Sequence, residues 1–160
     1  MSTSLTRVRA ALAAAQLRET IRETSDARTA QDAAAAIGCD VDQIAKSIIF
    51  ARQDDGQAIL FLTAGGNQVD LDAAAQVAGA QLGKADANAV RAQTGFAIGG
   101  VSPLGHLTPI RCFMDPRLTE FTEIWAAAGT PRHVFAVAPA DLVRATDAQV
   151  TDFTAQFKKM

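Results

Sequence analysis

The sequence predicts an α+β (mixed α/β) fold, in which a mixed, largely antiparallel central sheet is flanked by helices. Short apolar runs rich in strand-forming residues alternate along the chain with alanine-rich segments that carry helix caps. The connections between the apolar runs are short, and one of them has the form of a hairpin turn. No stretch rich in Gly, Pro or Ser is long enough to act as a linker, so we expect residues 1–160 to form a single domain.

The first elements are a helix, a short strand and a second helix. Apolar residues recur at helical spacing over Thr6–Leu17, and Thr6 is available as the cap. Thr20–Thr24 alternates as a short strand does, and Ser25–Arg28 is a polar joint. An alanine-rich helix follows over Thr29–Gly38, where the final glycine can adopt the left-handed conformation that ends many helices.

A β-hairpin is predicted next. Val41–Ile44 has the composition of a brief helical turn, and it leads into the strand-forming run Lys46–Arg52. Asp54–Gly56 is a turn signal, and Ala58–Thr63 is a second strand. Gly65 and Gly66 end the hairpin.

Two helices follow the hairpin. Val69–Asp72 begins an alanine-rich helix that ends at Gly79. Ala85–Asp86 starts a shorter helix over Asn88–Thr94, which Gly95 closes.

The C-terminal third alternates strands and helices. Ile110–Met114 is expected to be a strand, and Asp115–Pro116 suits a helix start because proline is tolerated in the first turn. Glu123–Ala126 has an extended pattern and His133–Val137 is another strand. Pro139–Arg144 forms the last predicted helix.

The segment Phe96–Gly105 combines an apolar run with three glycines and a proline, and His106 follows it directly. Phe96–Ile98 is predicted to be a strand. Gly99–Gly105 has two interpretations. It is a tight turn between buried strands, or a loop whose backbone groups approach a small ligand, because glycine permits conformations and close approaches that other residues do not.

Composition excludes several classes of protein. A net charge of −2 and a pI near 5.6 argue against a broad basic surface for long nucleic acids, but not against contact with a short nucleic-acid end. Cys39 and Cys112 are far apart and belong to no CxxC pair, so neither a zinc site nor a disulfide framework is expected. The N-terminal residues lack the apolar core of a signal peptide and no segment is long enough to span a membrane, which predicts a cytoplasmic protein.

Lys46 is the most informative of the four lysines. Lys158 and Lys159 are expected to form a solvated tail, and Lys84 is expected to be exposed. Lys46 stands where a strand begins, beside the apolar run Ile48–Phe50. Most lysines in such a position extend to solvent. If Lys46 instead faces a pocket, its ammonium suits binding a phosphate or polarising a carbonyl.

Four segments, in their order and spacing, resemble the YbaK-like aminoacyl-tRNA deacylases. This family includes the editing domain inserted in bacterial prolyl-tRNA synthetases and its free-standing trans-editing relatives. The segments are Thr29–Ala35, Ile44–Phe50, Gly99–Gly105 and Gly129–His133. The resemblance covers roughly residues 20–150, with residues 1–19 as an N-terminal helix before this core.

The resemblance implies a hydrolase for the ester that joins a wrong amino acid to the terminal adenosine of a tRNA. Lys46 corresponds to the family's characteristic lysine, which is thought to hold the phosphate or ribose near that adenosine. The family's G-x-x-x-P loop corresponds to Gly99–Pro103, with backbone groups against the aminoacyl moiety. The resulting assignment is Lys46, Gly99, Gly100 and Ser102 as catalytic residues, and Val101, Pro103, Gly129 and His133 as substrate-binding residues.

The implied partner is the acceptor end of aminoacyl-tRNA, with an aminoacyl-tRNA synthetase as a further candidate and no metal or organic cofactor. One expected substrate is tRNA-Pro that carries a small wrong amino acid. The alternative is a non-catalytic module of the same fold that binds the aminoacyl-tRNA end or a synthetase. Both functions use a pocket at Lys46, and the oligomeric state stays open.

Other catalytic interpretations are weaker. Ser102 is an unlikely nucleophile because Leu104 stands where a G-x-S-x-G elbow needs glycine, and His106 is too close in sequence for the usual base. Asp70 and Asp72 lie at a helix start, where carboxylates favour the helix dipole. The aromatic residues expected in the core are Phe113, Phe121 and Trp125.

Overall fold

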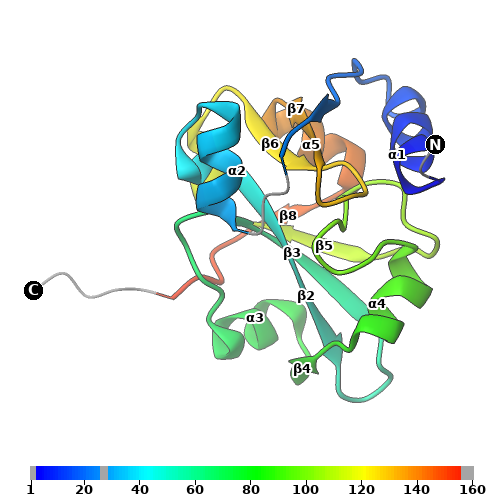
Figure 1. Cartoon of the computed structure of the whole chain (residues 1–160). Helices are drawn as coiled ribbons and strands as arrows, with labels where there is room; N and C mark the ends of the chain where they lie inside the picture. Colours follow the sequence, from blue (N-terminus) through cyan, green and yellow to red (C-terminus); the bar gives the residue numbers. More distant parts are fainter. Residues whose placement is uncertain (1–2, 26–28, 156–160) are drawn as a thin grey trace, which may run out of the picture.

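The computed structural model describes residues 3–25 and 29–155, and it contains an eight-stranded mixed sheet with helices on both faces (Figure 1). The strand order is β1-β7-β6-β2-β3-β5-β8, and β4 pairs with β2 off this path. The strands are β1 (Arg22–Glu23), β2 (Ile44–Arg52), β3 (Ala58–Ala64), β4 (Leu82–Lys84), β5 (Arg111–Met114), β6 (Ile124–Ala127), β7 (His133–Val137) and β8 (Gln149–Val150). The α-helices are α1 (Thr3–Ala14), α2 (Ala30–Ile37), α3 (Leu71–Ala78), α4 (Ala87–Thr94) and α5 (Pro139–Thr146), and the 3₁₀ turns are η1 (Val41–Gln43) and η2 (Pro116–Glu120).

The predicted hairpin and the mixed character of the sheet are both confirmed. β2 and β3 pair antiparallel from Ala45↔Ala64 to Ala51↔Ala58. β3 also pairs in parallel with β5, and β5 with β8. On its other side β2 pairs in parallel with β6, which is followed by the antiparallel pairs β6–β7 and β7–β1.

Strand β3 lies at the centre of the molecule and is buried along its whole length. Leu60 and Leu62 point to one face of the sheet, where buried residues of α1, α4 and α5 complete the larger core cluster. Ile59 and Phe61 point to the other face, against Phe113, Phe153 and the alanines of α3. A strand covered on both faces reads as a continuous apolar run, which is why Ala58–Thr63 was recognisable in the sequence.

Most predicted helix boundaries are confirmed because their caps are local. The Thr29 side chain accepts from the Asp32 N–H at the start of α2, and Gly38 ends this helix at φ +86°. Asp70 and Asp86 cap α3 and α4 in the same way. Both ends of α1 differ from the prediction of Thr6–Leu17: the helix begins at Thr3, so that Thr6 lies inside it, and it ends at Ala14.

The earlier start of α1 has a packing reason. Leu5 is buried together with Val8 and Leu12, so the apolar stripe of the helix extends one turn further toward the N-terminus than expected.

The strand predicted over Phe96–Ile98 was wrong. Phe96 is fully buried in the larger core cluster, whereas Ile98 is 59% exposed, and the Gly100 N–H donates to the Ala97 carbonyl to form a turn. The segment is therefore attached to the core by the Phe96 ring alone, and its backbone does not join the sheet.

The short strands β4 and β8 were not predicted. Of the polar joint, residues 26–28 lie outside the described residues, as do Lys158 and Lys159.

None of the helices over residues 3–25 and 29–155 is long and apolar enough to cross a membrane.

Candidate functional site

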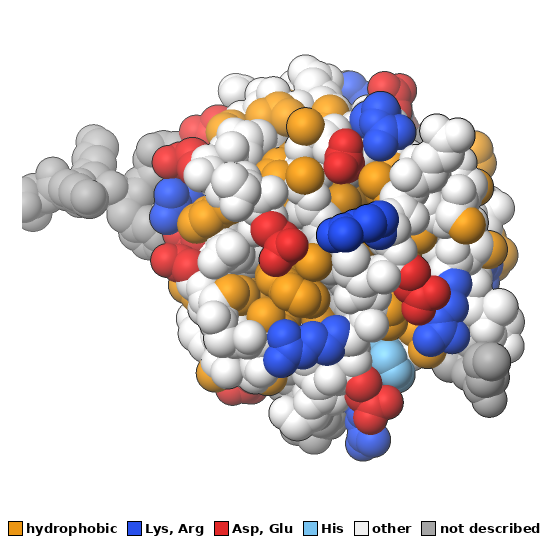
Figure 2. All heavy atoms as spheres, turned by 90° about the horizontal axis from the view of Figure 1, so that it is seen from above, with side chains coloured by type: hydrophobic (Ala, Val, Ile, Leu, Met, Phe, Trp, Pro, Cys, Tyr) orange, Lys and Arg blue, Asp and Glu red, His pale blue; other side chains and the backbone are white. Residues whose placement is uncertain are grey.

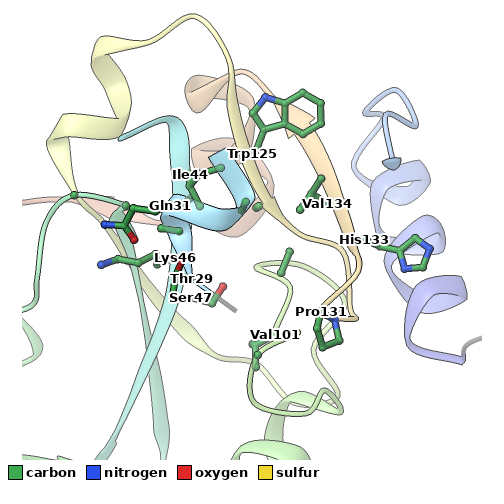
Figure 3. Close-up of a pocket in the computed structure, with 18 of the residues that line it drawn as sticks. Thr29, Gln31, Ile44, Lys46, Ser47, Val101, Trp125, Pro131, His133 and Val134 are labelled. Carbon is green, nitrogen blue, oxygen red and sulfur yellow. The ribbon is translucent and has the colours of Figure 1, made fainter. Parts of the chain in front are cut away.

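A cavity of about 480 Å³ opens where β2 and β6 separate (Figure 3). These strands pair only at Ile44↔Trp125 and Ala45↔Ala126, and β2 next finds a partner on that side at Phe50, in β4. The intervening edge of β2 faces the cavity with Lys46 and Ser47, and the glycine loop contributes Gly99 and Val101. A break in the sheet thus creates the space.

Among the described residues that line this cavity, Lys46 is the only Lys, Arg, Asp or Glu. Its Nζ donates to the Asn67 carbonyl at 2.6 Å. Burial lowers the pKa of the Lys46 ammonium, and the nearby carboxylates Asp115 and Asp42 oppose that effect. The ammonium has three N–H donors, so one bond to Asn67 leaves capacity for a ligand.

The turn that carries Asn67 is held by two aspartates. Buried Asp115 accepts from the Ala64 N–H at 3.1 Å and from the Asn67 side chain at 2.9 Å. Asp42 accepts from the Gly66 N–H at 2.8 Å, and its other oxygen pairs with Arg117 at 3.0 Å. The partner of the Lys46 ammonium is therefore fixed from outside the cavity.

Gly65, which precedes Asn67 in this turn, must also be small. A Cβ on Gly65 would lie 2.2 Å from the Val41 carbonyl oxygen, a contact that no side chain can make without moving backbone. The close approach of Gly65 to the turn before β2 brings the two ends of the hairpin together beside Lys46.

The glycine loop divides into residues that line the cavity and residues that do not. Gly99, at φ +93°, and Val101 line it. In the part of the chain that the structure describes, neither of their N–H groups has an acceptor. Gly100 packs instead against the 129–131 turn, where a Cβ would lie 2.9 Å from the Thr130 Cα.

Ser102 is fully buried outside the cavity lining, and its Oγ accepts from the Leu104 N–H at 3.1 Å. The His106 ring contacts the Ser102 carbonyl oxygen at 2.7 Å, and burial lowers the pKa of this histidine. Pro103 lies in a separate surface depression with His106. The three residues brace the loop from the side away from the cavity.

The opposite wall is the 129–134 segment. Thr130, Pro131, His133 and Val134 line the cavity, and Gly129 lies outside the lining at φ +98°. His133 Nδ1 is 2.7 Å from Thr130 Oγ1 and its Nε2 is 3.4 Å from a Glu23 carboxylate oxygen. Figure 3 shows the imidazole directed away from Lys46.

Two cavity residues were not recognised as such from the sequence. Trp125, expected in the core with Phe113, is only partly buried and lines the cavity, whereas Phe113 is fully buried and Phe121 partly. Ser47 also lines the cavity, and its Oγ is a buried side-chain oxygen with no partner among the described residues. Its position next to Lys46 was visible in the sequence, but its lack of a partner was not.

Ser47, Gly99 and Val101 also line a smaller, mainly apolar cavity of about 230 Å³. The remaining lining of this side chamber is Ile48, Ile49, Ala85, Val90 and Ile98. A hydroxyl with no partner at the junction of two cavities is satisfied when a ligand or water reaches it.

The described residues of the site combine a single side-chain cation with backbone donors. None of the described residues that line the main cavity carries a carboxylate or a thiol. Over the described ranges, no group of three or more His, Cys, Asp or Glu side chains is placed to hold a metal ion. An arrangement of one ammonium and free N–H groups suits a ligand with an anionic or carbonyl oxygen.

The fold and this site define a single domain with a cavity at a break in a mixed sheet, and the cavity is lined by Lys46 and by backbone N–H groups. Comparison with known proteins identifies the family of this domain: the chain belongs to the aminoacyl-tRNA editing domain family, whose sequence model matches residues 24–145. The YbaK-like resemblance is thereby confirmed.

Individual relatives agree with this assignment. The chain is 34% identical over 120 residues to the uncharacterized protein YwhH of Bacillus subtilis (strain 168), covering 75% of each protein. A crystal structure of a candidate trans-editing enzyme for prolyl-tRNA synthetase superposes with a TM-score of 0.91 at 42% identity, over 98% of this chain and 99% of that one. The crystal structure of hypothetical protein APE2540 has a TM-score of 0.85 at 25% identity, over 93% and 99%.

Proposed function

We propose that this protein is a trans-editing hydrolase that cleaves the aminoacyl ester of mischarged tRNA. The observation that carries the proposal is the partly buried ammonium of Lys46, fixed by the Asn67 carbonyl in a cavity that is also lined by Gly99 and Val101, whose N–H groups have no acceptor among the described residues. Family membership supplies the substrate class. In this proposal the whole chain, residues 1–160, acts as one domain in the cytoplasm, where tRNA is charged.

The proposed reaction needs orientation more than a strong nucleophile. An aminoacyl ester is already activated, so a placed water and a polarised carbonyl suffice. Water adds to the ester carbon, and the oxyanion that forms accepts from backbone N–H groups of the Gly99–Val101 loop. The ribose oxygen then leaves with a proton, which releases free amino acid and uncharged tRNA.

Lys46 holds the phosphate or ribose of the terminal nucleotide in this mechanism. Val101 and Ser47 contact the aminoacyl moiety, and Gly100, Ser102, Pro103 and Gly129 act by shaping the walls. His133 acts at the rim of the cavity. A small cavity separates side chains by only about 1–3 kcal/mol per methylene, so few residues decide which amino acid is removed.

The substrate proposed first is tRNA-Pro that carries a small wrong amino acid, because the prolyl trans-editing candidate matches nearly the whole chain. A synthetase that presents the tRNA is the proposed second partner. The face in Figure 2 mixes Lys and Arg with Asp and Glu side chains. Such a surface is expected to bind a long nucleic acid only weakly.

One observation favours a second candidate function. In the described part of the chain, no carboxylate that could act as a general base lines the cavity. A module that binds aminoacyl-tRNA ends or a synthetase without hydrolysis would need no such group.

The deciding experiment incubates the protein with tRNAs charged with alanine, cysteine, serine or threonine and measures ester loss against a no-enzyme reaction. Lys46→Ala is expected to abolish the acceleration, and Lys84→Ala, an exposed lysine in β4, is the matched control. No ester loss above background on any charged tRNA would favour the binding module. Acceleration that survives Lys46→Ala would remove the role proposed for Lys46.

A further inference from the structure

Trp125 lies at one end of the main cavity, on the same face of the sheet as Lys46. Trp125 pairs directly with Ile44 across the β2–β6 ladder, and Lys46 is two residues further along β2. Side chains two residues apart in a strand point to the same face. The indole and the ammonium therefore share one surface, separated by about one strand repeat.

The indole is held in place from one side. Ile44 and the α2 residues Ala30 and Ala33 form a small apolar cluster in which Trp125 is a partly buried member. A large aromatic side chain packed on one side and open to a cavity on the other is a rigid platform with little conformational entropy to lose.

Arg22 lies over this platform. Its guanidinium carbon is 5.9 Å from the centre of the Trp125 ring, near the outer limit of a cation–π contact. Arg22 is exposed, and in the described part of the chain it has no ion pair. A flat ring inserted between the guanidinium and the indole needs about 3.5 Å on each side. A small outward movement of Arg22 would therefore admit one such ring.

The surface between Arg22 and Lys46 is formed by small apolar side chains. Arg22 pairs with Val134 and Val134 with Ala127, so these residues form one row across β1, β7 and β6 toward Lys46. Val134 and Ala127 both line the cavity. The surface thus offers a cation for a phosphate at one end and an aromatic face for a planar group beside it.

We propose that Trp125 is the stacking platform for the adenine base of the bound terminal nucleotide, with Arg22 closing over the opposite face of the base. This inference rests on the proposed function for its ligand. It also sets the direction of the substrate in the cavity. The base lies at the Trp125 end, the phosphate or ribose at Lys46, and the aminoacyl group at the Ser47, Gly99 and Val101 end.

The chain offers a direct spectroscopic test, because Trp125 is its only tryptophan and it contains no tyrosine. Indole fluorescence is excited at the red edge of its absorption, where AMP does not absorb, and AMP is added to millimolar concentration. We expect saturable quenching by AMP and none by ribose 5-phosphate, which lacks the base. Equal responses to the two compounds, or no response to AMP, would overturn the inference.

Two variants separate stacking from folding. Calorimetric titration with AMP is expected to show a dissociation constant raised about tenfold or more in Trp125→Leu, because a base–aromatic stack contributes that much. Trp125→Phe keeps an aromatic face and is expected to retain most of the affinity. Equal affinity in Trp125→Leu and the parent protein would overturn the inference, and thermal unfolding verifies that each variant is folded.

The deacylation assay distinguishes failure of this inference from failure of the proposed function. Ester hydrolysis with an unchanged KM in Trp125→Leu would refute the platform and leave the editing activity standing. AMP binding that calorimetry detects in the parent protein and that Trp125→Leu weakens, with no hydrolysis of any charged tRNA, would leave the platform standing and favour a nucleotide-end binding module.

Discussion

The Lys46 ammonium donates a hydrogen bond of 2.6 Å to the Asn67 carbonyl, and buried Asp115 accepts from the Asn67 side chain at 2.9 Å. The position of Lys46 is therefore set by the turn after β3 and by the carboxylate of Asp115, which does not line the cavity. Asp115 also caps η2 by accepting from the Arg117 N–H. A single side chain connects the stability of this corner with the geometry of the site.

Replacement of Asp115 by Ala is expected to lower both stability and activity. It removes three hydrogen bonds to the carboxylate and leaves buried donors without partners, which costs about 2–3 kcal/mol. The proposed deacylation rate should fall because Asn67 no longer fixes Lys46. Chemical denaturation and single-turnover hydrolysis measure the two effects.

Asp86→Ala is the matched control, because Asp86 caps α4 on the surface by accepting from the Ala89 N–H. It should lower the free energy of unfolding by about 1 kcal/mol and leave hydrolysis unchanged. If both variants lost stability while retaining the full rate, Asp115 would have no positioning role.

Ser47→Ala is expected to leave the free energy of unfolding almost unchanged. The Ser47 Oγ is buried without a partner in the described structure, so its removal breaks no hydrogen bond within the protein. Thr94→Ala provides the contrast. Thr94 is fully buried, donates to the Val90 carbonyl and accepts from the Phe96 N–H, and its truncation should cost about 1–3 kcal/mol.

Thermal unfolding of the two variants checks this difference. A loss of more than about 1 kcal/mol in Ser47→Ala would mean that the hydroxyl is satisfied inside the folded protein. Its effect on hydrolysis is a separate readout, because a hydroxyl at the junction of the two cavities is placed to contact the aminoacyl group.

The helices and the hairpin could be predicted because their signals are local. Thr29, Asp70 and Asp86 cap their own helices, and glycines in the left-handed conformation end them. Phe96–Ile98 has the same apolar composition as a strand, but the single buried ring of Phe96 anchors it outside the sheet. Periodicity over three residues does not separate these two outcomes.

The candidate site was predictable in part. Lys46 and the loop with Gly99 and Val101 were identified, since a scarce lysine and a glycine cluster are visible in the sequence. Trp125 was not, because its placement depends on a parallel β2–β6 pairing that ends after two residue pairs. Asn67 and Asp115 are 48 positions apart and meet only in the folded chain.

The stability of the protein is expected to depend on pH through His106. Burial lowers the pKa of His106 from its ordinary value of 6.5, with nearby Arg7 acting in the same direction. The unfolded chain therefore binds more protons than the folded one between the lowered pKa and 6.5. The free energy of unfolding falls as the pH drops through this window and levels off below it.

Urea unfolding at a series of pH values isolates this effect as the difference between the parent protein and His106→Gln. Gln retains a donor for the Ser102 carbonyl but does not titrate. The variant should lack the part of the pH dependence that His106 contributes. Parallel curves for the two proteins would show that His106 does not contribute to it.

Binding of tRNA is expected to depend only weakly on salt. The net charge is −2, and the face in Figure 2 mixes side chains of both signs. If Lys46 contacts a phosphate near the terminal nucleotide, one counterion is released from a single strand, and a second is released if one further positive side chain reaches a phosphate. A plot of the logarithm of the association constant against the logarithm of the salt concentration should then have a slope of about −0.7 to −1.4.

Lys46→Gln should reduce the magnitude of that slope by about 0.7, and Lys84→Gln should leave it unchanged. A slope several times steeper in the parent protein would reveal a broad contact with the acceptor stem, and the protein would then select its tRNA without a carrier.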